Sequence, residues 1–207
     1  MLLPRSCCGR GRFVIARGLM RQPPVLFRGC TVLSERVAIF IDGNNFYHRL
    51  KDLYGQIRID YAKFAELLCR DRVFTRAHFY IAEVKPKHGK ELYDPHRAFM
   101  NYLGNVPYYV IRYGRLEKAG NTFVEKAADV YLATDMLRLA YTNAYDTAIL
   151  VSSDGDFVPA VEAVKELGKH VEVAFMLKTR SHHLRQVCNV FIPIDSAFLN
   201  KCKVRKR

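Results

Sequence analysis

Continuous apolar runs recur along most of the chain, separated by longer segments of mixed polarity. Short runs with few polar positions are typical of strands that are buried on both faces of a sheet. The runs are spaced widely enough for a helix to fit between each pair. On this pattern we predict strands over residues 36–41, 76–84, 106–114, 146–152 and 170–176, with 190–194 as a sixth candidate.

The segments between the runs carry helix signals. Asp60 stands where it can cap a helix, Asp94 followed by Pro95 is an N-cap and N1 pair, and Gly168 can end a helix. Residues 115–124 have a polar centre that suggests a small hairpin or excursion. We predict helices over residues 45–54, 61–70, 95–103, 127–143, 156–167 and 181–188.

Strands that alternate with helices of ten or so residues indicate an α/β fold. Because the central runs are apolar throughout, we expect an open, mostly parallel sheet of five to six strands with helices on both faces. The chain of 207 residues is long enough for one such core. We therefore expect a basic, disordered extension over 1–34, a single domain over 35–196 and a basic tail over 197–207.

The positive charge lies mainly at the ends of the chain. The net charge is +13, but residues 1–34 contribute +6 and residues 201–207 contribute +5, which leaves only +2 for residues 35–200. The basic total therefore says little about the core. The tail can add phosphate contacts, although a short basic tail is more often simply solvated. The acid-free, Arg-bearing extension has the composition of an organellar transit segment, and equally of sequence upstream of a later true start.

Cysteine usage and hydropathy bear on the compartment. The six cysteines include no C-x-x-C pair, which favours reduced thiols in a cytoplasmic setting over a zinc or disulfide framework. His182, His183 and Cys188 lie close in sequence but lack a fourth ligand and the usual spacing for zinc. No apolar run reaches the roughly 18 residues of a membrane span, so we expect no membrane partner.

Three aspartates that are distant in the sequence are predicted to meet at one edge of the sheet. Asp42 directly follows the first strand, Asp154 comes two residues after the fourth, and Asp129 lies in the first turn of the longest helix. The carboxyl ends of parallel strands share an edge, and the crossover helices start there. Like charges so placed need a cation, and oxygen ligands without His or Cys favour Mg²⁺ or Mn²⁺ over zinc. The chemistry indicated is metal-assisted phosphoryl transfer or hydrolysis.

Several of these residues also have a purely structural interpretation. Asp42 followed by Gly43 is a common turn pair. Asn44 or Asn45 can cap the next helix, and Asp156 can cap the helix that follows it. Each residue alone is therefore a weak signal, and the argument for a site depends on their joint placement.

A second acid of the longest helix is set apart by geometry. Asp135 lies six residues from Asp129, which is about 240° around the helix and about 9 Å along its axis. It shares a face with Arg138 and can pair with it at i,i+3, so we interpret it as a solvated or paired surface acid. Asp129 shares a face with apolar residues next to the core. Asp146, just before the fourth strand, is interpreted as a turn or strand-end residue.

Three blocks of the sequence resemble one known family. The blocks are VAIFIDGNNFYHRL, EKAADVYLATDML and DTAILVSSDGDFVPAVEAVKELGKHVEV. They are similar to those of the NYN domain, in the LabA-like branch of the PIN-like nucleases, over about residues 36–195. The resemblance implies a PIN-like three-layer α/β/α sandwich and a Mg²⁺-dependent ribonuclease or RNA-processing protein. Ala127 and Ala128 stand where a Gly-Val-like pair is common in the family.

Carried onto the matching positions, the resemblance implies a site built on aspartates. Asp42, Asp129 and Asp154 would hold Mg²⁺ or Mn²⁺, and Asp156 would be a further ligand or would position a water molecule. The residues expected to support this site or to bind phosphate are Asn44, Asn45, Lys126, Ser152 and Ser153.

We expect a metal-dependent endoribonuclease acting on single-stranded or structured RNA, as a monomer or a homodimer. The alternative is a regulatory NYN protein that binds RNA or a protein partner without turnover. A haloacid-dehalogenase phosphatase would need D-x-D directly after the first strand, where this chain has Asp42, Gly43 and Asn44. A Toprim enzyme would need Glu83 and would leave Asp42 and Asp129 unexplained.

A nuclease also needs a groove for the nucleic acid strand, with cations for phosphates and aromatic rings for unpaired bases. The basic candidates are Lys85, Lys87, His88, Lys90, Arg112, Arg115 and Lys118. The aromatic candidates, for which a place in the core is the more common role, are Tyr47, Tyr108, Tyr109 and Tyr113.

Overall fold

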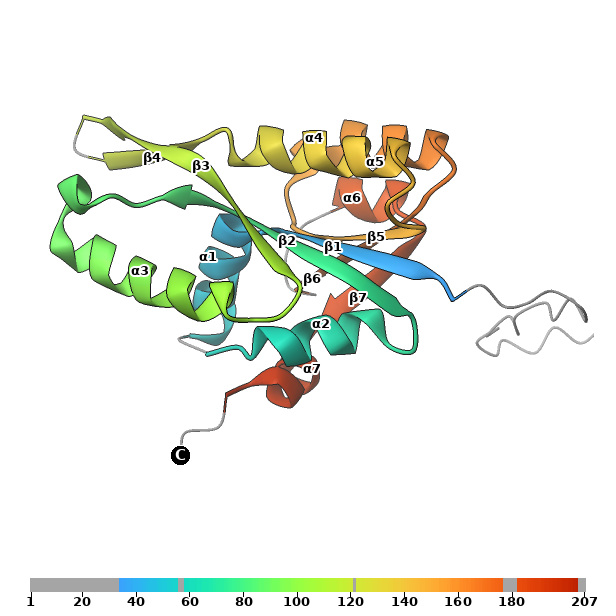
Figure 1. Cartoon of the computed structure of the whole chain (residues 1–207), viewed down its shortest axis with the longest axis horizontal. Coiled ribbons are helices and arrows are strands. Elements are labelled where there is room, and N and C mark those ends of the chain that lie inside the picture. The colour runs from blue at the N-terminus through green and yellow to red at the C-terminus, as the bar shows by residue number, and fades with distance from the viewer. Residues whose placement is uncertain (1–33, 56–57, 121, 177–181, 205–207) are drawn as a thin grey trace, which may run out of the picture. The chain divides into compact units, whose positions relative to one another are not determined.

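The computed structural model describes residues 34–55, 58–120, 122–176 and 182–204. The expected N-terminal extension, apart from Ser34, lies outside these ranges. Within them the chain forms one sheet of seven strands in the order β4-β3-β2-β1-β5-β6-β7 (Figure 1). The strands are β1 (Arg36–Asp42), β2 (Val73–Glu83), β3 (Tyr109–Ala119), β4 (Thr122–Lys126), β5 (Thr147–Val151), β6 (His170–Met176) and β7 (Val190–Ile194).

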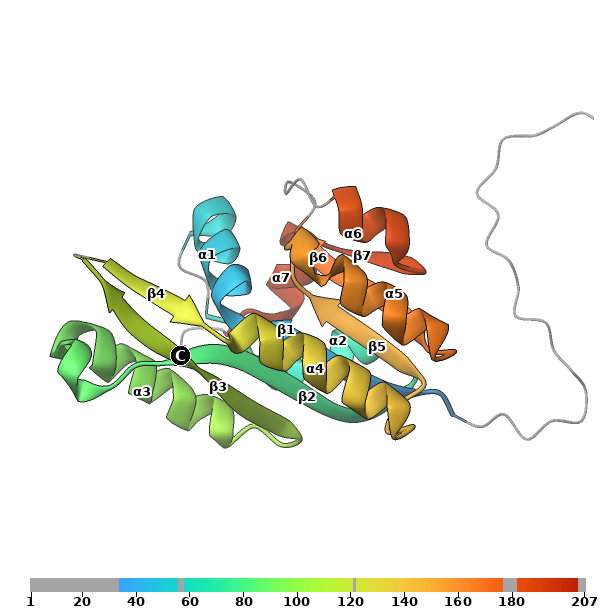
Figure 2. The ribbon, with the colours of Figure 1, turned by 90° about the horizontal axis from the view of Figure 1, so that it is seen from above.

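The expected parallel sheet is confirmed, with one strand more than the upper estimate. Every neighbouring pair is parallel except β3 and β4, which form an antiparallel hairpin at the edge of the sheet (Figure 2). The helices are α1 (Gly43–Tyr54), α2 (Tyr61–Cys69), α3 (Lys90–Gly104), α4 (Ala128–Tyr141), α5 (Val158–Glu166), α6 (His182–Val187) and α7 (Ser196–Cys202), with 3₁₀ turns η1 (Pro86–His88) and η2 (Gly155–Phe157).

Helices cover both faces of the sheet, so the chain is a three-layer α/β/α sandwich. α4, α5 and α6 lie on one face, and α1, α2, α3 and α7 on the other (Figures 1 and 2). Alternate residues of β1 contribute to the cores on the two faces. Val37, Ile39 and Ile41 point into the core under α1, α2, α3 and α7. Ala38 and Phe40 point into the core under α4, α5 and α6. Apolar strands are explained by this burial on both faces.

One helix begins well before its predicted start, and another helix was not predicted. α3 begins at Lys90, five residues before the predicted start, and Pro95 lies inside it. Gly89, at φ 100°, ends η1 and sets the start of the helix, so the Asp94-Pro95 signal is overridden at the loss of one helical hydrogen bond. α7 was not predicted at all, although Asp195 caps it by accepting from Phe198 N–H at 2.8 Å. The expected basic tail therefore starts inside a helix, whose Leu199 and Cys202 are buried.

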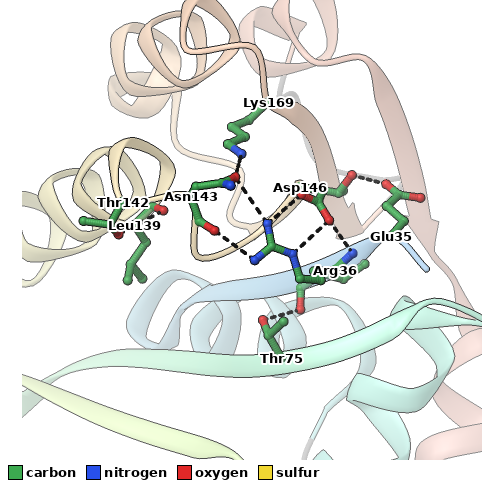
Figure 3. A network of polar contacts seen from close by, with 10 residues as sticks. Glu35, Arg36, Thr75, Leu139, Thr142, Asn143, Asp146 and Lys169 are labelled. Atoms are coloured by element: carbon green, nitrogen blue, oxygen red, sulfur yellow. Dashed lines mark hydrogen bonds and ion pairs between the residues drawn. The ribbon is translucent and has the colours of Figure 1, made fainter. Parts of the chain in front are cut away.

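A polar network fastens the amino ends of β1 and β5 (Figure 3). The Arg36 guanidinium donates to both oxygens of Asp146, at 2.8 and 3.1 Å, and to the carbonyl of Asn143 at 2.9 Å. The Asp146 carboxylate also accepts the Arg36 backbone N–H at 2.8 Å. These bonds from Arg36 lower the pKa of Asp146 to about 2. Asp146 is thus a strand-end residue with a structural partner, at the sheet edge formed by the amino ends of the parallel strands.

The cysteines within the described ranges, Cys69, Cys188 and Cys202, carry free thiols. Each helix within those ranges is too short or too polar to cross a membrane.

Candidate functional site

The carboxyl ends of β1 and β5 form the point at which strand order reverses. From β1, the chain continues to β2 on one side, and β5 pairs with β1 on the other. A sheet of this kind leaves an open crevice between the two diverging connections. Asp42 is the last residue of β1 and Ser152 is the first residue after β5. Both continue the alternation that faces α4 and α5.

Asp42 is held by two hydrogen bonds. It is 5% exposed, and its Oδ1 accepts the Asn45 backbone N–H at 3.1 Å while its Oδ2 accepts the Ser152 hydroxyl at 2.9 Å. Asp42 is therefore the N-cap of α1, and the alternative interpretation of Asn44 or Asn45 as its cap does not hold. Asp42, two residues before Asn44, takes this role because it ends the extended strand, where the backbone is already in the N-cap conformation.

The segment after β5 is tied to the start of α1. Ser153 donates to the Asn45 side-chain oxygen from its backbone N–H at 3.3 Å and from its hydroxyl at 3.0 Å. The Ser152 hydroxyl oxygen also accepts the Asp154 N–H at 3.1 Å. Asn45, Ser152 and Ser153 thus support the loop that carries Asp154. Asn44 is exposed on α1, and its side chain makes no hydrogen bond within the described residues.

Asp154, not Asp156, has the capping role in the loop after β5. Asp154 is the N-cap of η2, and its Oδ1 accepts the Asp156 N–H at 3.0 Å. α5 begins later, after Phe157, with no side-chain cap, so the alternative interpretation of Asp156 as a helix cap does not hold. The 3₁₀ turn that precedes α5 moves the cap to Asp154 and leaves the Asp156 carboxylate exposed.

Asp129 stands in the first turn of α4 and shares an electrostatic environment with the other aspartates. Burial raises the pKa of Asp129, and the charges of Asp154 and Asp156 raise it further. Burial raises the pKa of Asp42 to about 6, aided by the charges of Asp129 and Asp154 and opposed by its two hydrogen bonds. The structure therefore brings the four predicted aspartates near enough for their charges to interact.

A fifth carboxylate was missed by the sequence analysis. Glu125 lies on β4, and burial with the charges of Asp42 and Asp129 raises its pKa to about 7. It accepts the Ala82 backbone N–H, and its Oε1 is buried with no hydrogen-bond partner. Only the antiparallel β3–β4 hairpin, in which β4 runs back towards the start of α4, could have shown this. The sequence signal is no more than a Glu preceding Lys126. We call Asp42, Glu125, Asp129, Asp154 and Asp156 the acidic cluster.

The acidic cluster has no cation to balance it among the described residues, since none of its members forms an ion pair there. Lys126 does not fill this role: it pairs with Glu117 at 2.8 Å, and as the neighbour of Glu125 on a strand it points to the other face. With the side chains as they stand, no three His, Cys, Asp or Glu residues of the described ranges are grouped closely enough to hold a metal ion.

The other acid of α4 has a place that the sequence did not reveal. Asp135 accepts from Arg138 at 2.9 Å, as predicted, but it is only 8% exposed and is not a surface acid. It also accepts the Tyr80 hydroxyl at 3.1 Å and lies 3.3 Å from Arg112 Nε. This flank of α4 faces β2 and β3, whose Tyr80 and Arg112 side chains cover a position that a simple helical wheel would leave in solvent.

The candidate groove residues fall into separate groups. Tyr109 packs against the core and donates to the Tyr61 carbonyl at 2.7 Å, whereas Tyr47, Tyr108 and Tyr113 are exposed. Four of the predicted basic residues line one cavity together with Glu83, Leu116 and Glu117; they are Lys85, Lys87, His88 and Arg115.

Comparisons with known proteins agree with this architecture. The family model described as NYN domain matches residues 36–195. The chain is 26% identical over 179 residues to the low amplitude and bright protein LabA of Synechococcus elongatus, a match that covers 81% of this chain and 89% of that protein. A crystal structure of a protein of unknown function from Vibrio parahaemolyticus has a similar fold, with a TM-score of 0.65 and 24% identity over 83% of this chain and 97% of the other. The chain therefore belongs to the NYN domain family.

Proposed function

We propose that this protein is a metal-dependent endoribonuclease that hydrolyses phosphodiester bonds at the acidic cluster. The observation that carries the proposal is the unbalanced charge of partly buried carboxylates at the switch point of a parallel sheet. Burying carboxylates without a partner costs free energy, and a bound cation removes that cost. Membership of the NYN family supports a nuclease or RNA-binding role.

The residues present fit Mg²⁺ or Mn²⁺. The donors are all oxygens, which these ions prefer, and Glu125 Oε1 is buried without a partner beside the other carboxylates. Asp42, Asp129 and Asp154 would hold the ion. When bound, the ion would supply an acidified water molecule and compensate the negative charge of the phosphodiester.

The protein's own residues prepare the site. The hydrogen bonds from Asn45 and Ser152 fix the orientation of Asp42 and hold its pKa below the value that burial alone would give. Asp154 is fixed through the same Ser152 hydroxyl. The exposed Asp156 carboxylate is free to orient a water molecule, and the exposed Asn44 can donate to a substrate phosphate. Lys126 would reach a phosphate only after leaving Glu117.

A second candidate function is RNA or protein binding without turnover. One observation favours it: as they stand, no three candidate ligand side chains of the described ranges are grouped for metal binding. The two functions differ in outcome, because a non-catalytic protein gives no cleavage products with any divalent ion or RNA.

The test is cleavage of labelled single-stranded and hairpin RNA by the full chain with Mg²⁺ or Mn²⁺. Asp42→Asn and Asp154→Asn should each abolish cleavage, by at least about a hundredfold, because each removes a charge that the ion requires. Asp52→Asn is the matched control, since Asp52 is exposed on α1 and outside the acidic cluster. Thermal unfolding verifies that all variants are folded. Undiminished cleavage by both cluster variants would refute the assignment.

A further inference from the structure

We propose that Arg76, Arg112 and Arg138, called here the arginine cluster, bind backbone phosphates of the RNA strand whose cleavage site lies at the acidic cluster. This inference rests on the proposed function and extends it, because it assigns the path of the substrate away from the site. Neither the family blocks nor the acidic cluster includes these residues.

The three arginines converge around one buried position. The charges of Arg76, Arg112 and Arg138 all act on His78, which is 7% exposed in the middle of β2. Arg138 Nη2 lies 2.9 Å from Asp135 Oδ1, and Arg112 Nε lies 3.3 Å from Asp135 Oδ2. The cluster therefore joins three elements, β2, β3 and α4.

The arginine cluster lies on the same face of the sheet as the acidic cluster. Arg76, His78 and Tyr80 alternate along β2, and Tyr80 packs in the core beneath α4. Asp42 continues the alternation of Phe40 on that same face. α4 connects the two clusters: Asp129 is in its first turn, and Asp135 and Arg138 follow on the next turns, about 9 Å and about 14 Å further along the axis.

The local charge is unbalanced and positive. Asp135 is the one carboxylate that pairs with these arginines within the described residues, against three guanidinium groups. Burial lowers the pKa of His78 to about 4, so the imidazole is neutral at pH 7 and adds no charge. Like charges held together are stabilised by an anion. Guanidinium groups suit phosphate because their planar fork can form two parallel hydrogen bonds to it.

The pairing with Asp135 organises the cluster without neutralising it. Asp135 is fixed by the Tyr80 hydroxyl at 3.1 Å and is nearly buried, whereas about half of the Arg112 and Arg138 side chains remains exposed. Two guanidinium groups are thus anchored on one side and open to solvent on the other. Arg76 is exposed and has no ion-pair partner within the described ranges. Anchoring lowers the entropy that is lost when a phosphate binds.

The cavity lined by Lys85, Lys87, His88 and Arg115 is the weaker candidate for this role. It also contains Glu83 and Glu117, and Lys85 already pairs with Glu83 at 3.2 Å. Arg115 and Lys126 are opposite each other on β3 and β4, on the face of the hairpin away from Glu125. The cavity and the acidic cluster are therefore on different faces of the hairpin.

The experiment measures binding of a fluorescent single-stranded RNA to the full chain by anisotropy, at several salt concentrations. All variants carry Asp42→Asn, so that the RNA is not cleaved while its binding is measured. Arg76→Gln and Arg112→Gln should each raise Kd by about three- to tenfold and reduce the salt slope by about 0.7 for each phosphate that is no longer bound. Arg70→Gln, an exposed arginine at the end of α2 on the other face, is the matched control and should leave Kd unchanged. Lys87→Gln tests the cavity.

The outcomes separate this inference from the proposed function. The inference would be overturned if the Arg76→Gln, Arg112→Gln double variant kept the Kd and salt slope of the parent chain. It would also be overturned if Lys87→Gln weakened binding and the arginine variants did not. Absence of RNA binding by the background chain would also overturn it. None of these results decides the hydrolase proposal, which depends on cleavage by the chain with Asp42 intact.

Discussion

The Ser152 hydroxyl donates a hydrogen bond of 2.9 Å to Asp42 Oδ2, and its oxygen accepts the Asp154 N–H at 3.1 Å. One fully buried side chain thus joins the end of β1 to the loop after β5 and holds two of the proposed ligands. The bond to Ser152 also lowers the pKa of Asp42 against the effect of burial.

Ser152→Ala should therefore raise the pKa of Asp42 above its value of about 6 and destabilise the protein by about 1–3 kcal/mol. We expect the acidic limb of the pH–rate profile for RNA cleavage to move to higher pH. Asp146→Asn, which removes a charge at the opposite edge, is the control and should leave the profile in place. An unshifted limb in Ser152→Ala would contradict the role given to this hydroxyl.

The metal-free protein should lose stability as the pH rises from about 4 to about 7. Asp42 and Glu125 have folded-state pKa values of about 6 and about 7, above those of the unfolded chain. The folded state therefore binds more protons in this window, so its stability falls as these protons leave. Mg²⁺ should raise the melting temperature more at pH 8 than at pH 5. The Asp42→Asn, Glu125→Gln double variant should flatten the pH dependence; a slope equal to that of the parent chain would contradict this account.

Gly43→Ala should destabilise the protein by about 1–3 kcal/mol. A Cβ at Gly43 would lie 2.4 Å from Phe79 Cε1 and 2.7 Å from the Tyr80 carbonyl oxygen, and Phe79 is buried and cannot move away. Gly104→Ala is the matched control, because no atom lies within 4 Å of its added Cβ. Denaturant unfolding of both variants measures the difference, and equal stabilities would show that the start of α1 can shift.

Ala127→Gly should stabilise the protein by up to about 1 kcal/mol. Ala127 is the N-cap of α4 and has φ 70°. A Cβ in this conformation costs about 1–2 kcal/mol, whereas glycine is unstrained. Part of this gain is offset because glycine makes the unfolded chain more flexible. Glycine would suit the left-handed turn at this position. Ala128→Gly, one residue into the helix, should destabilise instead. Thermal unfolding distinguishes the two; a lower melting temperature for Ala127→Gly would refute the strain argument.

Asp146→Asn should weaken folding only modestly while leaving RNA cleavage unchanged. Asp146 and Arg36 are both more than a third exposed, so solvent screens their ion pair and its loss should cost less than about 1 kcal/mol. Because the pKa of Asp146 is lowered to about 2, its contribution is present above about pH 4 and is lost as the pH falls towards 2. Stability of the parent and variant should accordingly converge in acid; a difference that persists at pH 2 would point to packing.

The sequence by itself determined the central strands and the residues that end them. Continuous apolar runs specify strands buried on both faces, and this local pattern predicted β1, β5 and β6 to within a residue or two. The alternation of βα units then predicted a parallel sheet, whose strands share one carboxyl edge. Asp42 and Asp154 were therefore identifiable from their positions in the chain.

Only the tertiary structure decided which other side chains join them. Glu125 reaches the acidic cluster because β4 turns back antiparallel to β3, and Asp135 is buried because α4 lies over Tyr80 with Arg112 beside it. Neither contact has a local signature, since each depends on which strands are neighbours in the sheet. The caps were likewise decided by backbone conformation, which places Asp42 and Asp154 at the helix starts in preference to the asparagines and Asp156. Hydrophobic periodicity is a property of one segment and can be recognised in the sequence. The burial and electrostatic environment of a site depend on several segments that only folding brings together.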